Sequence, residues 1–293
     1  MASLLSLLCG YAQAEDPGRF HLKIGFSSKA FVNVPRDDIK IAVQVLSQKV
    51  AKKTIGSAES RVYDTTAEIE KDLKIKKLDI VALTPEEFIQ LKAHAPLEPV
   101  MVTVAWKSHE VELLLLGRKE SGFKRVAELK NRSIALPSES SQYSSMYRTW
   151  VENLVMKEGA ASPDRFFSAL QETRNASQAV MSVFFRKADV CVVSSHTFEV
   201  TSELNPQIAR ELKVIASISR LSGGVITIRR DLSEERKQRI IQALQTLHED
   251  QDGKQMFVLF QLSRLAPYRP EYLKETEALY EEQRSLRARM VRR

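Results

Sequence analysis

Hydroxyl-bearing side chains are concentrated in one short stretch of the sequence. Residues 138–145 read SESSQYSS and contain five serines and one tyrosine. The stretch follows an apolar run at 134–136 and precedes apolar residues at helical spacing, which are Met146, Trp150, Val151, Leu154 and Val155. First-turn amides of a helix lack intrahelical partners and lie at the positive end of the helix dipole, and serine hydroxyls add further donors. A strand, a serine-rich turn and a helix in this order could therefore bind an anion.

Helix capping is the alternative explanation for these serines. Capping one helix needs only one or two hydroxyls, so five serines are an excess that favours ligand binding. The predicted donors are Ser138, Ser140, Ser141 and Tyr143. Tyr143 could bond or stack on a ligand, or it could pack in the core, and both interpretations stay open.

Three further hydroxyl-rich turns follow predicted strands at 21–26, 79–83 and 189–193. Their candidate ligand-binding residues are Ser27 and Ser28, Thr84, and Ser194, Ser195 and His196. In α/β folds, small molecules bind beyond the carboxyl ends of strands, where loops meet helix N-termini. We therefore expect these turns to converge on one site. His196 could donate to an anion or could pack on the surface.

The elements that must position these turns alternate between strand and helix along the chain. One series of short strands and amphipathic helices occupies the first hundred residues, and a second begins near residue 111. Two such series without a flexible linker predict an α/β protein with two lobes, each a mixed sheet flanked by helices, and a ligand cleft between them. The predicted lobes are 21–106 with 207–293, and 107–206.

The first fourteen residues have the features of a secretory signal peptide. Residues 1–14 carry no charged side chain, contain four leucines and end in Ala-Gln-Ala. The usual basic segment is missing. No other apolar run approaches the roughly 20 residues that a spanning helix needs, so we expect a secreted chain that does not span a membrane. Cleavage after Ala14 would leave Cys191 as the only cysteine, and its apolar neighbours predict a buried, inert side chain.

The sequence contains no recognisable motif for catalysis, metal binding or nucleic-acid binding. The five histidines lack metal-ligand spacing, and the sequence has no G-x-S-x-G elbow, phosphate-binding loop or dinucleotide-binding glycine turn. The net charge is +7, but basic residues alternate with acidic ones except at 284–293. We expect no enzymatic activity, no metal or cofactor and no nucleic-acid partner.

Several segments together resemble one family of binding proteins. They are DIVALTPEEF at 79–88, the serine turn after IALP at 134–137, KADVCVVSSHTF at 187–198, and the segment at 222–257. These segments resemble the type 2 periplasmic solute-binding proteins of ABC importers, specifically the phosphate/phosphonate-binding group. The resemblance extends over residues 22–272 and implies the two-lobed fold of that family.

The resemblance also implies site roles. In the family, a Ser-Thr-Ser-Gly-like turn after a strand holds the phosphonate oxygens, and Ser140 and Ser141 match it most directly. The chain departs from that pattern at Glu139, a carboxylate beside the expected anion, and at Gln142, where the family has glycine. An acidic residue that often holds a ligand's amino group is replaced here by Ser194. The implied ligand is phosphate, a phosphonate or a related oxyanion.

Partners and location follow from the same resemblance. It implies a periplasmic monomer that closes around a small anionic solute and delivers it to an ABC permease. Two alternatives stay open. One is a sensing module that acts in trans on a signalling partner such as a sensor kinase, and the other is a small-molecule enzyme on the same fold.

Overall fold

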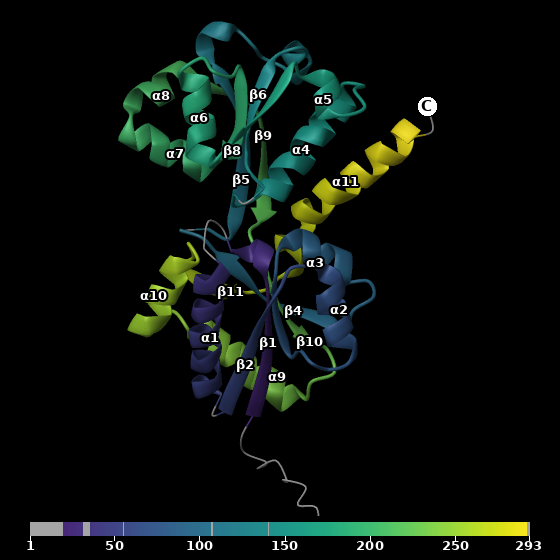
Figure 1. Ribbon diagram of the computed structural model, residues 1–293, viewed down its shortest axis with the longest axis vertical. Coiled ribbons are helices and arrows are strands. Elements are labelled where there is room, and N and C mark those ends of the chain that lie inside the picture. The colour runs from purple at the N-terminus through teal and green to yellow at the C-terminus, as the bar shows by residue number, and fades with distance from the viewer. Residues whose placement is uncertain (1–19, 32–35, 55, 107, 140, 292–293) are drawn as a thin grey trace, which may run out of the picture.

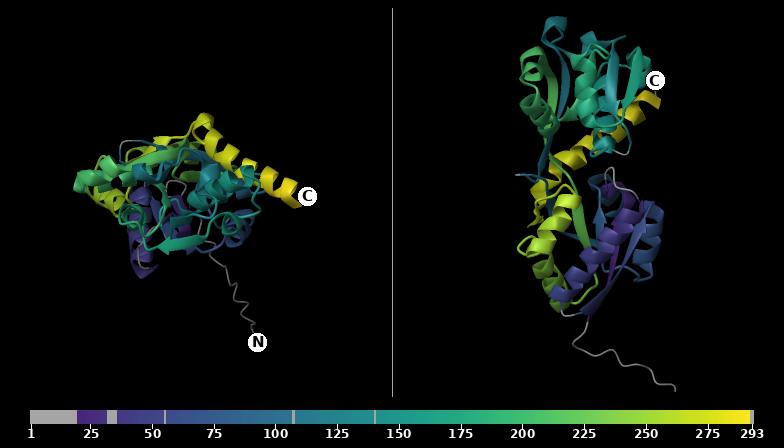
Figure 2. Two further views of the ribbon diagram at one scale, coloured as in Figure 1. Left: turned by 90° about the horizontal axis from the view of Figure 1, so that it is seen from above. Right: turned by 60° about the vertical axis from the view of Figure 1, so that its left-hand side comes forward.

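The fold is known from a computed structural model that describes residues 20–31, 36–54, 56–106, 108–139 and 141–291. The predicted signal peptide and Ser140 lie outside the described residues. Two sheets organise the rest of the chain into two lobes, which are stacked along the long axis of the molecule (Figures 1 and 2). The predicted two-lobed α/β fold is therefore confirmed.

The sheet of lobe 1 has six strands in the order β11-β4-β10-β3-β1-β2. Their bounds are β1 Phe20–Ser27, β2 Gly56–Tyr63, β3 Ile80–Leu83, β4 Leu97–Val104, β10 Val225–Arg229 and β11 Arg264–Pro267. Strand β1 pairs in parallel with β2 and β3, whereas β10 and β11 run antiparallel to their neighbours. The parallel strands share one carboxyl edge, and this edge faces lobe 2 (Figure 1).

The sheet of lobe 2 has five strands in the order β7-β6-β8-β5-β9. Their bounds are β5 Glu110–Arg118, β6 Ser133–Pro137, β7 Ala169–Thr173, β8 Val190–Ser194 and β9 Leu212–Ser222. Strand β6 is parallel to β7 and β8, and β5 is antiparallel to β8 and β9. The chain crosses between the lobes from β4 to β5 and again from β9 to β10.

Helices cover both faces of each sheet (Figure 1). In lobe 1 they are α1 Arg36–Lys53, α2 Thr66–Lys74, α3 Pro85–Leu91, α9 Glu234–Gln245 and α10 Gln251–Leu259. In lobe 2 they are α4 Ser144–Lys157, α5 Pro163–Phe166, α6 Ala176–Phe184, α7 Ser195–Leu204 and α8 Pro206–Glu211. Short 3-10 turns occupy Ser28–Ala30, Lys119–Ser121, Val126–Leu129 and Pro270–Tyr272. Within the described ranges, no helix combines the length and apolar character that crossing a membrane would require.

The last helix, α11 Lys274–Val291, begins near the crossing segments and extends along α4 of lobe 2 (Figures 1 and 2). Its Leu279 and Tyr280 belong to the hydrophobic core of lobe 2. The predicted boundary assigned residues 207–293 to lobe 1. In the structure, β9 hydrogen-bonds to β5 and so belongs to the sheet of lobe 2. By sheet membership, the second crossing lies between Ser222 and Val225.

Local sequence explains why the helices begin where they do. Thr84 caps α3 in a capping box, in which its hydroxyl accepts from the Glu87 amide and the Glu87 carboxylate accepts from the Thr84 amide. Ser194 caps α7 by accepting from the amide of Thr197 at 3.2 Å. Helix α4 has a different start, since Tyr143 at its N-cap adopts a left-handed conformation with φ of 64°.

Candidate functional site: a cavity between the lobes

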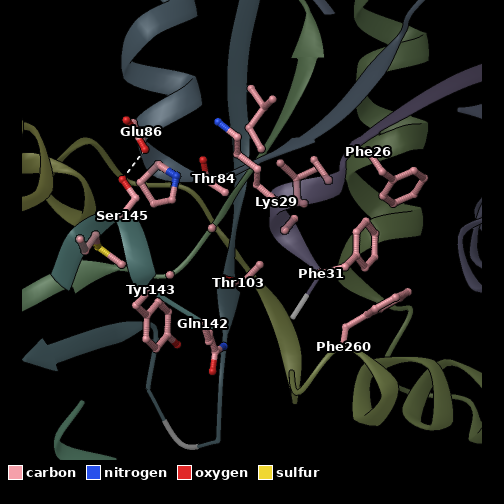
Figure 3. Close-up of a pocket in the computed structure, with 18 of the residues that line it drawn as sticks. Phe26, Lys29, Phe31, Thr84, Glu86, Thr103, Gln142, Tyr143, Ser145 and Phe260 are labelled. Atoms are coloured by element: carbon pink, nitrogen blue, oxygen red, sulfur yellow. Dashed lines mark hydrogen bonds between the residues drawn. The ribbon is translucent and has the colours of Figure 1, made fainter. Parts of the chain in front are cut away.

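A cavity of about 750 Å³ lies at the edge where the two lobes meet. Thr84, Glu86 and Thr103 line it from lobe 1, and Ser141–Ser145 line it from lobe 2. Gly223 and Gly224, at the second crossing between the lobes, complete this part of the wall. Figure 3 shows Thr84, Thr103, Gln142 and Tyr143 around the shared space. We call this region, lined by residues of both lobes, the polar mouth.

The turn between β6 and α4 supplies hydrogen-bond donors to the polar mouth. Its backbone is fixed by bonds from the Ser141 amide to the Ser138 carbonyl at 2.9 Å and from the Ser144 amide to the Ser141 carbonyl at 3.1 Å. The Tyr147 amide is the first to bond back along the helix, to Tyr143. The amides of the first turn therefore lack intrahelical acceptors, and no acidic residue occupies that turn to offset the positive end of the dipole. This end of α4 can accept an anion.

Lys29 contributes a cation to the polar mouth. In the described part of the chain, its ammonium group makes no hydrogen bond or ion pair, and its side chain extends along the cavity near Thr84 (Figure 3). The other two lining cations are paired: Arg148 with Glu172 at 3.1 Å, and Arg287 with Glu152 at 2.6 Å. Lys29 can therefore contribute attraction for an anionic ligand.

Three carboxylates also line the cavity, and one of them, Glu152, is paired with Arg287. Glu139 is exposed, so water solvates its charge. Glu86 accepts a hydrogen bond from the Ser145 hydroxyl across the gap between α3 and α4 (Figure 3). Because Ser145 uses its proton on Glu86, the neighbouring Tyr280 hydroxyl, 3.1 Å away, donates to Ser145. This chain of bonds joins lobe 1, lobe 2 and α11 at one side of the cavity.

Tyr143 lies beside the second crossing between the lobes. A Cβ atom placed on Gly223 would lie 3.6 Å from the Tyr143 hydroxyl, which is ordinary van der Waals contact, so the tyrosine packs against the backbone of this crossing. Burial raises the pKa of Tyr143 to about 12, which keeps its hydroxyl protonated at neutral pH. Tyr143 can therefore act as a neutral donor to an anion.

The structure separates the residues predicted from the sequence into two groups. Ser28, Thr84, Ser141 and Tyr143 line the cavity. Ser27, Ser138, Ser194, Ser195 and His196 are not among its lining residues. The roles of the first group in ligand binding stay predictions.

Specific contacts explain why the second group lies outside the lining. The buried Ser27 hydroxyl donates to Glu87 at 2.7 Å and so stabilises the start of α3. The Ser138 hydroxyl donates to the Arg174 carbonyl at 3.2 Å. The His196 ring stacks on Trp106, with 4.2 Å between ring centroids. The remaining two hydroxyls begin α7, where Ser194 serves as the cap.

Several lining residues were not predicted as ligand-binding from the sequence. Thr103 lies within a strand pattern, Ser145 was counted only as part of the serine turn, and Glu86 follows the capping threonine. Tyr280 comes from the last helix, which no local pattern connects to the serine turn. Among the described residues, no group of three or more His, Cys, Asp or Glu side chains could hold a metal ion.

Comparisons with known proteins agree with this geometry. Residues 33–273 match the family described as ABC transporter, phosphonate, periplasmic substrate-binding protein. No curated protein matches the chain significantly.

Solved structures share the fold at low sequence identity. A binding protein component of an ABC phosphonate transporter from Pseudomonas aeruginosa is 17% identical, with a TM-score of 0.60 over 93% of this chain and 89% of that one. XAC2383 from Xanthomonas citri bound to ATP is 16% identical, with a TM-score of 0.62 over 92% and 98%. PhnD1 from Prochlorococcus marinus in complex with methylphosphonate is 15% identical, with a TM-score of 0.57 over 91% and 98%.

Proposed function

This chain belongs to the family of periplasmic substrate-binding proteins of phosphonate ABC transporters, and from that premise we propose that it binds a phosphonate or related oxyanion in the polar mouth and delivers it to an ABC permease. The observation that carries the proposal is the meeting of the first turn of α4 with Lys29, which has no carboxylate partner among the described residues, in one cavity between the lobes. Helix N-termini and nearby cations are recurrent binding sites for phosphoryl groups.

The ligands of two structural neighbours support this class of ligand. The Prochlorococcus marinus protein is in complex with methylphosphonate, and the Xanthomonas citri protein is bound to ATP. Both ligands carry a phosphorus oxyanion. The serine turn of this chain is rich in the donors that such a group requires, with Ser141 and Tyr143 both lining the cavity.

Hinge closure supplies the mechanism. A ligand that contacts both lobes stabilises the closed arrangement by its differential affinity for that state. The bond from Ser145 of lobe 2 to Glu86 of lobe 1 supports this, because it links the two lobes directly beside the cavity. A permease that recognises the closed shape would then accept the loaded protein. Delivery to a permease places the protein in the periplasm.

The test is a thermal-shift screen followed by calorimetry. Phosphate, phosphite, alkylphosphonates, alkylsulfonates and sulfate are compared, and at least one phosphorus oxyanion should raise the melting temperature by mass action. Ser141→Ala should weaken that ligand by about 10-fold or more, since hydrogen bonds to charged groups contribute about 1.5–3 kcal/mol. The exposed Ser168 of the same lobe provides the control Ser168→Ala, which should leave affinity unchanged. If no phosphorus oxyanion binds, the proposed function is wrong.

A further inference from the structure

The same cavity has a second region that the polar mouth does not account for. It extends from the polar mouth into lobe 1, where α1, α9, α10 and β11 supply its wall. We call this region the apolar chamber, and its residues are Leu46, Val50, Leu244, Leu247, Phe257 and Leu265. Every one of these side chains is a hydrocarbon, so the chamber offers a ligand no hydrogen bond and no charge.

Aromatic side chains stand at the entrance of the apolar chamber. Phe26, Phe31 and Phe260 form a row on one side of the cavity, opposite Gln142 and Tyr143 (Figure 3). The ring centroid of Phe31 lies 6.1 Å from the ring centroid of Phe26 and 5.2 Å from that of Phe260. Phe31 and Phe260 are only half-buried, although Phe31 packs against the hydrophobic core of lobe 1. Their remaining exposed surface faces the cavity and is available to an apolar group.

The size and lining of the cavity leave room for much more than a small inorganic anion. Cavities of about 300–1,000 Å³ accommodate drug-sized ligands, and this one measures about 750 Å³. An anion held by the first turn of α4 would occupy only the polar mouth. Water is a poor occupant of the rest, because buried water requires two to four polar partners.

We propose that the natural ligand is an organophosphonate or related organic oxyanion with an apolar arm, and that the arm enters the apolar chamber while the anion stays in the polar mouth. This inference rests on the proposed function, because it takes the anion site as given. Lys29 and Phe31 are two residues apart in the chain and both line the cavity, so the cation and the entrance row belong to one short segment. A single molecule can therefore reach both regions.

The test measures affinity along a homologous series by calorimetry. Methyl-, butyl- and octylphosphonate carry the same anion and differ only in the arm. Each buried methylene should tighten binding about fourfold, so butylphosphonate should bind roughly 50-fold more tightly than methylphosphonate. Octylphosphonate should bind more tightly still until the chamber is full.

Variants locate the arm. Leu46→Trp fills the chamber from α1 and should bring octylphosphonate close to the affinity of methylphosphonate, whose own binding should not change. The control Ile41→Trp makes a comparable change on the same helix at a side chain that is 63% exposed and does not line the cavity. Phe260→Ala, which removes one wall of the entrance, should weaken only the longer ligands. Melting curves establish that each variant is folded.

Different outcomes overturn different statements. If methylphosphonate binds the parent protein as tightly as the longer ligands, the apolar arm is wrong and the proposed function stands. If the longer ligands keep their advantage in both Leu46→Trp and Phe260→Ala, the arm does not enter this chamber and the inference is wrong. If no phosphonate binds the parent protein, the inference fails, and if phosphate and phosphite do not bind either, the proposed function fails with it.

Discussion

Replacing Lys29 tests whether its charge attracts the ligand. Lys29→Gln keeps a polar side chain of similar length but removes the only lining cation that lacks a carboxylate partner among the described residues. Two unit charges about 4 Å apart interact by about 1 kcal/mol in water and about 4 kcal/mol near a protein surface. Because Lys29 is exposed, the lower part of this range applies. We expect a loss of about 1.4 kcal/mol, which is a tenfold weaker affinity for a phosphonate.

Calorimetry at two salt concentrations distinguishes this charge effect from lost packing. Salt at about 1 M shortens the screening length to about 3 Å, so the difference between parent and Lys29→Gln should shrink there. Lys77→Gln is the matched control, since Lys77 is exposed, precedes β3 at the end away from the cavity and does not line it. Equal losses in the two variants, or an unchanged affinity in Lys29→Gln at low salt, would refute the reasoning.

Three further predictions concern closure, acid stability and thiol reactivity. Ser145→Ala removes the bond to Glu86 that links the lobes, so affinity should fall about tenfold and the unliganded protein should have a larger radius of gyration in X-ray scattering. Hydrogen bonds from Arg287 lower the pKa of Glu152, so this pair stabilises the folded protein above the unfolded pKa of Glu152 and loses that effect as the pH falls through the folded pKa. Arg287→Ala should therefore reduce the free energy of unfolding in urea by about 1 kcal/mol at pH 7 and by much less near pH 3. An equal reduction at both pH values would contradict this. Burial raises the pKa of the Cys191 thiol, so a thiol reagent should label Cys191 only after unfolding, and rapid labelling of Cys191 in the native protein, read by peptide mass spectrometry, would contradict this burial.

Local sequence patterns were sufficient for the fold class but not for every strand's partner. The alternation of strands and helices predicted two α/β lobes, and the two sheets confirm this. The segment at 214–219 is part of β9. Its place in lobe 2 depends on hydrogen bonds to β5, about a hundred residues earlier in the chain. No local pattern encodes such a long-range pairing, which is why the sequence predicted the boundary at 206 and not between Ser222 and Val225, where the structure has it.

The candidate site illustrates the same limit at the level of single hydroxyls. Ser27 and Thr84 both follow parallel strands and looked equivalent in the sequence. Thr84 lines the cavity, whereas Ser27 is buried with its proton donated to Glu87. The sequence shows where hydroxyls are, but the acceptor that engages each one is set by packing between α3 and the neighbouring strand end. The sequence could not predict the apolar chamber for a similar reason, because its lining residues come from the N-terminal and C-terminal parts of the chain and meet only in the folded protein.

The most direct measurement of the central claim is a crystal structure of the protein grown with an alkylphosphonate. We predict that the phosphonate oxygens lie against the first turn of α4 and within reach of the Lys29 ammonium group, in contact with both lobes. A phosphonate bound on the outer face of a single lobe, with the polar mouth unoccupied, would contradict the account.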